Sequence, residues 1–406
     1  MKKIEGGVCA PVGFRANGVH CGIRKNKTKR DLSLIVSDVR AAAACVYTQN
    51  LVKGAPIRVT KRHVADGYAQ AIVCNSGNAN TCNADGEEIA EGMCALVEGQ
   101  TGIPAADVVV ASTGVIGQPL SLEPIRAGMP SLAEGLSEDG SLFAAQGIMT
   151  TDTVDKQIAY SFTLGGKECR IGAIGKGVGM INPNMATMLI FITTDASISP
   201  EMLQKALSAD VKDSFNMVSV DGDTSTNDMV CVLANGMAEN EPVTASGKDF
   251  TVFRKALNKV TTALCRSIAK DGEGATKLLE CKVTGAKSRQ AARTVAKSVI
   301  KSSLFKAAMF GADANWGRVL CAIGYAGAEV DIGRVSVDFR SRAGTVAVCR
   351  EGSGIPFSEE EAKKVLSEDE IEVLIRLGDG NGKATAWGCD LTYDYVKING
   401  DYRTRS

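Results

Sequence analysis

A threonine stands where a polar loop turns into an apolar run. Residues 182–186 read Asn-Pro-Asn-Met-Ala, and Met-Leu-Ile-Phe-Ile follows Thr187 directly. A threonine hydroxyl becomes a nucleophile only when a base removes its proton, and the chain's two histidines, His20 and His63, form no arrangement that could supply one. Cutting the bond between Ala186 and Thr187 would free an α-amino group with an ordinary pKa of about 7.7–8.0, which can act as the base. The pattern therefore predicts self-cleavage by the Thr187 hydroxyl, although a β-branched residue opening a strand also fits it.

A second set of polar residues follows the apolar stretch 107–111. Ser112, Thr113 and Gly114 come at the end of this expected strand. A hydroxyl group and a glycine amide in that position can donate hydrogen bonds to an oxyanion. A glycine turn fastened by a threonine explains the same residues equally well.

The glycine-rich stretch 175–179 contains Lys176. It does not match a Walker A loop, which needs Ser or Thr after Gly-Lys, and no helix follows as a dinucleotide fingerprint requires. Lys176 is better interpreted as an anchor for a carboxylate, or as part of a plain strand-to-turn connection. Glu273 stands between two glycines and could hold an ammonium group.

The acidic stretch 221–229 resembles a calcium loop but has Thr226 at the position that requires glycine. We interpret it as a polar turn network beside a site.

Composition excludes several classes of function. Lys+Arg and Asp+Glu both number 46, so no global field attracts nucleic acid or an anionic membrane. Thirteen cysteines without a CxxC pair indicate a reducing compartment. Two histidines without partners at ligand spacing argue against zinc. No apolar run reaches the ~18 residues of a membrane helix, so we expect a soluble cytoplasmic protein without a metal.

The chain reads as groups of strands separated by blocks of helix. Helices are expected over 86–98, from a Ser-Pro-Glu start at 199, over 288–308 as one long helix, and over 358–366 behind a capping box. Residues 249–272 are expected to begin extended and become helical, and the last forty residues to alternate as strands. This order favours largely antiparallel sheets with helices outside, in a layered α/β sandwich.

Eight motifs together resemble the ornithine acetyltransferase family of arginine biosynthesis, also called glutamate N-acetyltransferase. In chain order they are NSGNAN, STGVIG, MTTDT, GKGVGMINPNMATMLIFITTDA, VDGDTSTNDM, DGEGATK, NWGRV and VKINGDYRT. They extend over nearly the whole chain. The resemblance implies an αββα sandwich similar to N-terminal-nucleophile hydrolases, in which two self-cleaved chains form one intertwined unit.

The resemblance also implies the roles of individual residues. Cleavage between Ala186 and Thr187 gives an α chain of residues 1–186 and a β chain of residues 187–406, and two of each assemble into a heterotetramer. Thr187 is the nucleophile, and Thr113 and Gly114 form the oxyanion hole. The positions expected to contact substrate are Thr150, Lys176, Thr187, Glu273, Asn399 and Thr404. The chain departs from the family pattern by continuing past Thr404 with Arg405 and Ser406.

The expected reaction moves an acetyl group from N2-acetylornithine to glutamate by a ping-pong mechanism. Family members differ in their use of acetyl-CoA, so acetyl-CoA is kept as a further co-substrate and no cofactor is expected. Two other functions fit parts of the pattern. One is an aminopeptidase-like hydrolase with the same nucleophile, and the other is a nucleotide-binding regulatory module that stays intact.

Overall fold

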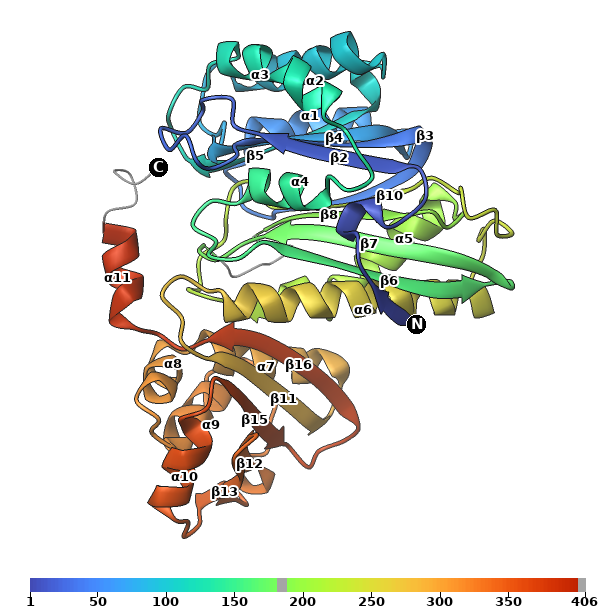
Figure 1. Ribbon diagram of the computed structural model, residues 1–406. Coiled ribbons are helices and arrows are strands. Elements are labelled where there is room, and N and C mark those ends of the chain that lie inside the picture. The colour runs from blue at the N-terminus through green and yellow to red at the C-terminus, as the bar shows by residue number, and fades with distance from the viewer. Residues whose placement is uncertain (181–187, 401–406) are drawn as a thin grey trace.

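The computed structural model describes residues 1–180 and 188–400 and contains two β-sheets (Figure 1). Within these residues the larger sheet has nine strands, mostly antiparallel, with parallel pairs at β4–β5 and β8–β10. Its order is β1 (Lys2–Ile4), β6 (Lys156–Leu164), β7 (Lys167–Lys176), β8 (Leu189–Thr194), β10 (Met229–Ala234), β3 (Leu32–Tyr47), β4 (Tyr68–Asn78) and β5 (Val108–Val115), with β2 (Phe14–Val19) on β3.

The long strand β3 connects two layers of this sheet. Its first part pairs with β2 and β4, and its last part pairs with β10. The register with β4 shifts between Val36 and Ala41, and the side chains at 38–40 are exposed there. Ile35 from the first part and Ala43 and Cys45 from the second belong to one buried cluster with residues of β4, β7, β8 and β10. The sheet therefore folds over at this shift and packs against itself.

Helices cover both outer faces of the folded sheet. One face carries α1 (Ala55–His63), α2 (Gly86–Thr101) and α3 (Glu123–Glu134), and the other carries α5 (Pro200–Asp210) and α6 (Lys248–Lys270). The short helix α4 (Ser141–Ile148) lies beside β2 and contributes Ala144 and Ile148 to the cluster between the layers. The predicted αββα layering is thus confirmed.

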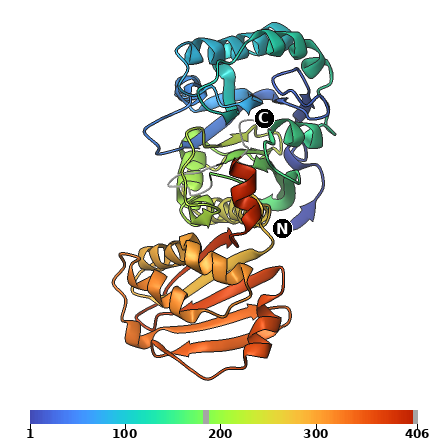
Figure 2. The ribbon, with the colours of Figure 1, turned by 90° about the vertical axis from the view of Figure 1, so that its left-hand side faces the viewer.

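A second, seven-stranded sheet lies beyond α6. Its order is β14 (Ser353–Gly354), β13 (Gly344–Arg350), β12 (Ser336–Ser341), β15 (Glu370–Arg376), β11 (Leu278–Ala286), β16 (Gly382–Cys389) and β9 (Val218–Ser219). Its helices are α7 (Arg289–Lys301), α8 (Ser303–Phe310), α9 (Trp316–Gly324) and α10 (Glu359–Leu366). The last helix, α11 (Tyr393–Gly400), leaves this part and lies beside the larger one (Figures 1 and 2).

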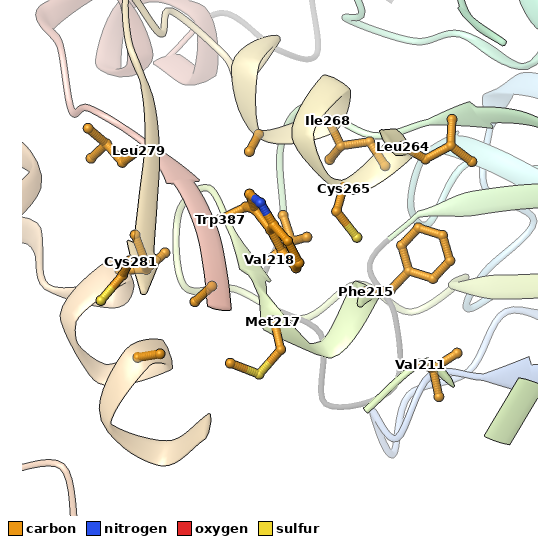
Figure 3. Close-up of a cluster of buried hydrophobic side chains, with 14 of the residues drawn as sticks. Val211, Phe215, Met217, Val218, Leu264, Cys265, Ile268, Leu279, Cys281 and Trp387 are labelled. Carbon is orange, nitrogen blue, oxygen red and sulfur yellow. The ribbon is translucent and has the colours of Figure 1, made fainter. Parts of the chain in front are cut away.

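Helix α6 packs against β6 and β7 on one side and against β11 and β16 on the other. Figure 3 shows Cys265 of α6 next to Trp387 of the second sheet, while Leu264 of the same helix points away from that sheet. All of them belong to one buried cluster. The two sheets therefore share a hydrophobic core through this helix.

Local signals in the sequence located several helix starts correctly. Ser199 accepts a hydrogen bond from the Met202 amide at 3.3 Å, and Ser358 accepts one from the Glu361 amide at 3.2 Å. Within the described ranges, no helix is long and apolar enough to cross a membrane.

Three sequence expectations were wrong. The helix expected over 288–308 is two helices, because Ser302 leaves the helical conformation and caps α8 by accepting from the Phe305 amide. Residues 249–272 do not begin extended: helix α6 already starts at Lys248, because Phe250 and Phe253 lie on its buried face. Tyr393 to Gly400 is helix α11 and not a strand, since β16 ends at Cys389.

The shared core makes a prediction about stability. Leu264 is 1% exposed in the cluster between the two sheets, so Leu264→Ala should lower the free energy of unfolding by about 2–5 kcal/mol. Chemical denaturation measures this change. Leu304→Ala is the control, because Leu304 is 62% exposed. A loss below about 1 kcal/mol for Leu264→Ala would show that α6 is not a core element.

Candidate active site

A cavity of about 120 Å³ lies where strands from distant parts of the chain end or begin. Strands β5 and β7 end at it and β8 begins there, because Lys176 at the end of β7 pairs with Leu189 at the start of β8. Six of the residues predicted from the sequence line this one cavity, namely Thr113, Gly114, Thr150, Lys176, Glu273 and Asn399.

Gly114 has a backbone that only glycine adopts easily. Its φ is +136°, and a Cβ atom there would lie 2.3 Å from the carbonyl carbon of Gly77 on β4. Two residues earlier in β5, the Ser112 hydroxyl donates to Asn75 Oδ1 of β4 at 2.6 Å. Thr113 and Gly114 are thus held at the cavity wall by tight packing between β4 and β5.

Lys176 is a buried cation at the end of β7. Its Nζ donates to Thr113 Oγ1 at 3.4 Å. Because an ammonium group can only donate, the Thr113 oxygen accepts, and its own hydrogen is available for another acceptor. Burial lowers the pKa of Lys176, and the nearby charge of Asp152 acts in the opposite direction. The arrangement couples the buried cation to one donor of the expected oxyanion hole.

Glu273 is one of two buried carboxylates that line the cavity, the other being Asp228. Its Oε1 accepts from the Thr151 hydroxyl at 2.8 Å, and its Oε2 accepts from Asn399 Nδ2 of α11 at 2.7 Å. Gly179 lies so close that a Cβ atom there would be 2.5 Å from the carboxylate. The glycine at 179 therefore makes room for this side chain.

Asn227 lines the cavity and connects three chain segments around it by hydrogen bonds. Its Nδ2 donates to the carbonyl oxygens of Ala79 at 2.6 Å and Ser112 at 2.9 Å, and its Oδ1 accepts from the Thr81 hydroxyl at 2.6 Å. Residues 225–228 line the cavity. The stretch 221–229 thus includes the polar network beside a site that the sequence predicted.

Some predicted residues lie outside the described part of the chain. These are Ala186 and Thr187 at the expected cleavage point, and Thr404 with Arg405 and Ser406 at the end. Met188, the next residue after Thr187, lines the cavity. The roles of the cavity residues also stay predictions.

Sequence reasoning did not single out Thr151 and Asp152. Both belong to the MTTDT motif, which alone looks like an ordinary polar turn. Asp152 is 5% exposed. Burial raises its pKa, but the charges of Lys176 and Lys156 outweigh burial and lower that pKa to about 2. The available signal in the sequence was a single carboxylate among threonines, shortly after the helix that ends at Ile148.

Together these groups suit a small zwitterionic ligand. Lys176 can bind a carboxylate, Glu273 can bind an ammonium group, and Thr113 with Gly114 can donate to a developing oxyanion. A cavity that combines the buried Lys176 ammonium with the carboxylates of Glu273 and Asp228 has groups that can bind both charges of an amino acid.

A family model and several relatives match nearly the whole chain. The model of the ArgJ family matches residues 15–404. The chain is 50% identical to the arginine biosynthesis bifunctional protein ArgJ 1 of Clostridium acetobutylicum, covering 96% of each chain. It is 47% identical to the arginine biosynthesis bifunctional protein ArgJ of Bacillus subtilis, covering 99% of this chain and 98% of the relative.

Solved structures also match parts of the chain. A crystal structure of the arginine biosynthesis bifunctional protein ArgJ from Bacillus halodurans is 49% identical and covers 52% of this chain and 97% of that one, with a TM-score of 0.49. Ornithine acetyltransferase from Mycobacterium tuberculosis, complexed with ornithine, is 33% identical and covers 46% of this chain and 99% of that one, with a TM-score of 0.42.

The packing at Gly114 makes a testable prediction. Gly114→Ala should lower the free energy of unfolding by about 1–3 kcal/mol or more, because the methyl group meets backbone atoms at a positive φ. The control is Gly117→Ala, since Gly117 also has a positive φ of +75° but no atom within 4 Å of the new Cβ. Equal losses in denaturant titrations of the two variants would contradict the tight packing of β5 against β4.

Proposed function

The chain belongs to the ArgJ family, and we propose that it is the glutamate N-acetyltransferase of arginine biosynthesis, also called ornithine acetyltransferase. It transfers an acetyl group from N2-acetylornithine to glutamate through an acetyl ester of Thr187. One observation supports this most strongly. The cavity unites the Thr113–Gly114 donors, a buried ammonium group and a buried carboxylate, and the residue after Thr187 lines its wall.

The first half-reaction releases ornithine. The Thr187 hydroxyl oxygen attacks the acetyl carbonyl carbon of acetylornithine, and the Thr187 α-amino group takes up the hydroxyl proton. The Thr113 hydroxyl and the Gly114 amide donate to the oxyanion that forms. The carbon–nitrogen bond then breaks, the proton passes to the departing amine, and the acetyl group stays on Thr187 as an ester.

The second half-reaction reverses these steps with another amine. The α-amino group of glutamate attacks the ester carbonyl, and the same two donors stabilise the second oxyanion. The carbon–oxygen bond breaks, Thr187 recovers its hydroxyl proton and N-acetylglutamate leaves. Because ornithine departs before glutamate enters, the kinetics are ping-pong.

Both substrates carry an α-carboxylate, which the buried Lys176 ammonium is suited to hold. They differ at the other end, where ornithine has an amine and glutamate a second carboxylate. Glu273 lines the same cavity and favours the distal amine of ornithine. Thr150, Asn399 and Thr404 complete the proposed substrate contacts.

Further parts of the proposal concern the donor and the assembly. We propose acetyl-CoA as an alternative acetyl donor to glutamate, and no other cofactor; the name of the relatives, which calls them bifunctional, fits a second activity. We also propose cleavage into chains 1–186 and 187–406, assembly of two copies of each, and a cytoplasmic location.

Replacement of Thr187 tests the proposal directly. Thr187→Ala should stay one chain on denaturing mass analysis and lose acetyl transfer, whereas the wild type gives a fragment beginning at Thr187. Thr193→Ala is the control, because Thr193 is a buried threonine in the neighbouring strand β8. Radiolabelled acetylornithine should label N-acetylglutamate in the wild-type reaction.

Other outcomes of that assay identify the alternatives. Release of labelled acetate without transfer to glutamate would indicate the aminopeptidase-like hydrolase. An intact wild-type chain without transfer would favour the binding module. A parallel reaction with acetyl-CoA and glutamate, lacking acetylornithine, reports the second donor.

Glu273→Gln tests how the two substrates are distinguished. Loss of the charge should raise KM for acetylornithine by about tenfold or more, since a hydrogen-bonded charge contributes about 1.5–3 kcal/mol. KM for glutamate should change far less or fall. The control is Glu134→Gln, because Glu134 is exposed on α3. Equal effects on both substrates would contradict the assignment.

A further inference from the structure

Asp152 directly follows Thr150 and Thr151, which line the cavity. It is in the loop between α4 and β6, and its Oδ1 accepts from the Lys156 ammonium at 2.8 Å and from the Gly177 amide at 3.0 Å. Its Oδ2 accepts from the Thr150 amide at 3.0 Å. We propose that Asp152 is a positioning residue, which fixes the end of β7 so that the Lys176 ammonium stays beside the Thr113 hydroxyl and faces the substrate carboxylate. This inference rests on the proposed function.

The bond to Gly177 fixes the backbone next to Lys176. The register of β6 with β7 runs only as far as Lys156 opposite Gly175. The Gly177 amide comes after this last pair, and a buried amide needs an acceptor. Asp152 Oδ1 supplies one, so the direction in which the chain leaves Lys176 depends on this carboxylate.

Charge makes the same carboxylate hard to replace. Lys156 and Lys176 are 3% and 8% exposed, and buried cations of one sign repel each other unless an anion lies between them. The charged groups that act on the pKa of Lys176 are Asp152, Lys156, Arg24 and Glu273, and among them Asp152 has the largest effect. Asp152 and Glu273 raise the pKa of Lys176, while burial and the two cations lower it.

The loop that carries Asp152 also reaches Glu273. Thr151, its neighbour, donates to the Glu273 carboxylate, and Lys156 bridges from Asp152 to Asp271 Oδ2 at 2.5 Å. Asp271 in turn accepts from the Thr153 amide at 3.1 Å. The loop is therefore held at both ends, and Lys176, through Gly177, and Glu273, through Thr151, both depend on its position.

The test compares Asp152→Asn with Asp155→Asn. Asp155 is a matched control three residues along the same loop, and the one hydrogen bond described for its side chain is from Gln157 at 3.4 Å. Transfer from acetylornithine to glutamate is measured over a range of pH, with melting temperature measured in parallel. For Asp152→Asn, kcat/KM for both half-reactions should fall by up to about 100-fold. The basic limb of its pH profile should move to lower pH, because a buried lysine without its carboxylate loses its proton more easily.

Asp152→Glu separates charge from position. It keeps the anion but displaces it, so its basic limb should lie closer to that of the wild type while kcat/KM stays reduced. This variant also serves if Asp152→Asn does not fold. A lower melting temperature with an unchanged pH profile and kcat/KM would overturn the inference and leave Asp152 a structural role only. An equal effect of Asp155→Asn would overturn it too. A wild type that transfers no acetyl group would instead contradict the proposed function.

Discussion

A cation inside an apolar sandwich must have an anion close to it, and this constraint shapes the cavity. Lys176 ends a strand whose preceding residues, Ile171 and Ala173 among them, are completely buried. Burial lowers the pKa of its ammonium group, and the charges of Asp152 and Glu273 act in the opposite direction. Each of these carboxylates is in turn held by polar groups from other segments, Asp152 by the Gly177 amide and Glu273 by Thr151 and Asn399. The hydrogen bonds around the cavity therefore form one connected set, in which no charged member can be removed alone without exposing the others to an unbalanced field.

Sheet topology explains how residues so far apart in sequence meet. Strands β5 and β7 deliver Thr113 and Lys176 to one edge, where β8 and β10 begin side by side in parallel register. Glu273 comes from the segment that leads out of α6 toward the second sheet, and Asn399 comes from the helix that returns. The second sheet thus contributes to the cavity through two of the segments that connect it to the larger part. This arrangement gives the smaller sheet a part in the site although its own strands lie beyond α6.

Features that depend on neighbouring residues were predictable from the sequence. The caps at Ser199 and Ser358 and the buried strand after Thr187 all follow from local pattern, and the structure contains them. The motifs of a known family predicted which residues would share a cavity. Long-range effects were not predictable. The position of Asp152 depends on a partner far away in the chain, since Gly177 lies 25 residues from it. The expected nucleophile itself lies outside the described residues.

The position of β8 has a consequence for how the molecule is built. This strand is hydrogen-bonded to β7 on one side and to β10 on the other, and β10 pairs with β3. With a break after residue 186, β3 and β7 would come from the first piece and the two strands between them from the second. Two rows of backbone hydrogen bonds in the middle of one sheet, between β7 and β8 and between β10 and β3, would then join the two pieces. Neither piece could complete its own hydrophobic interior, so the two would have to fold together as one cooperative unit and could not dock as finished halves.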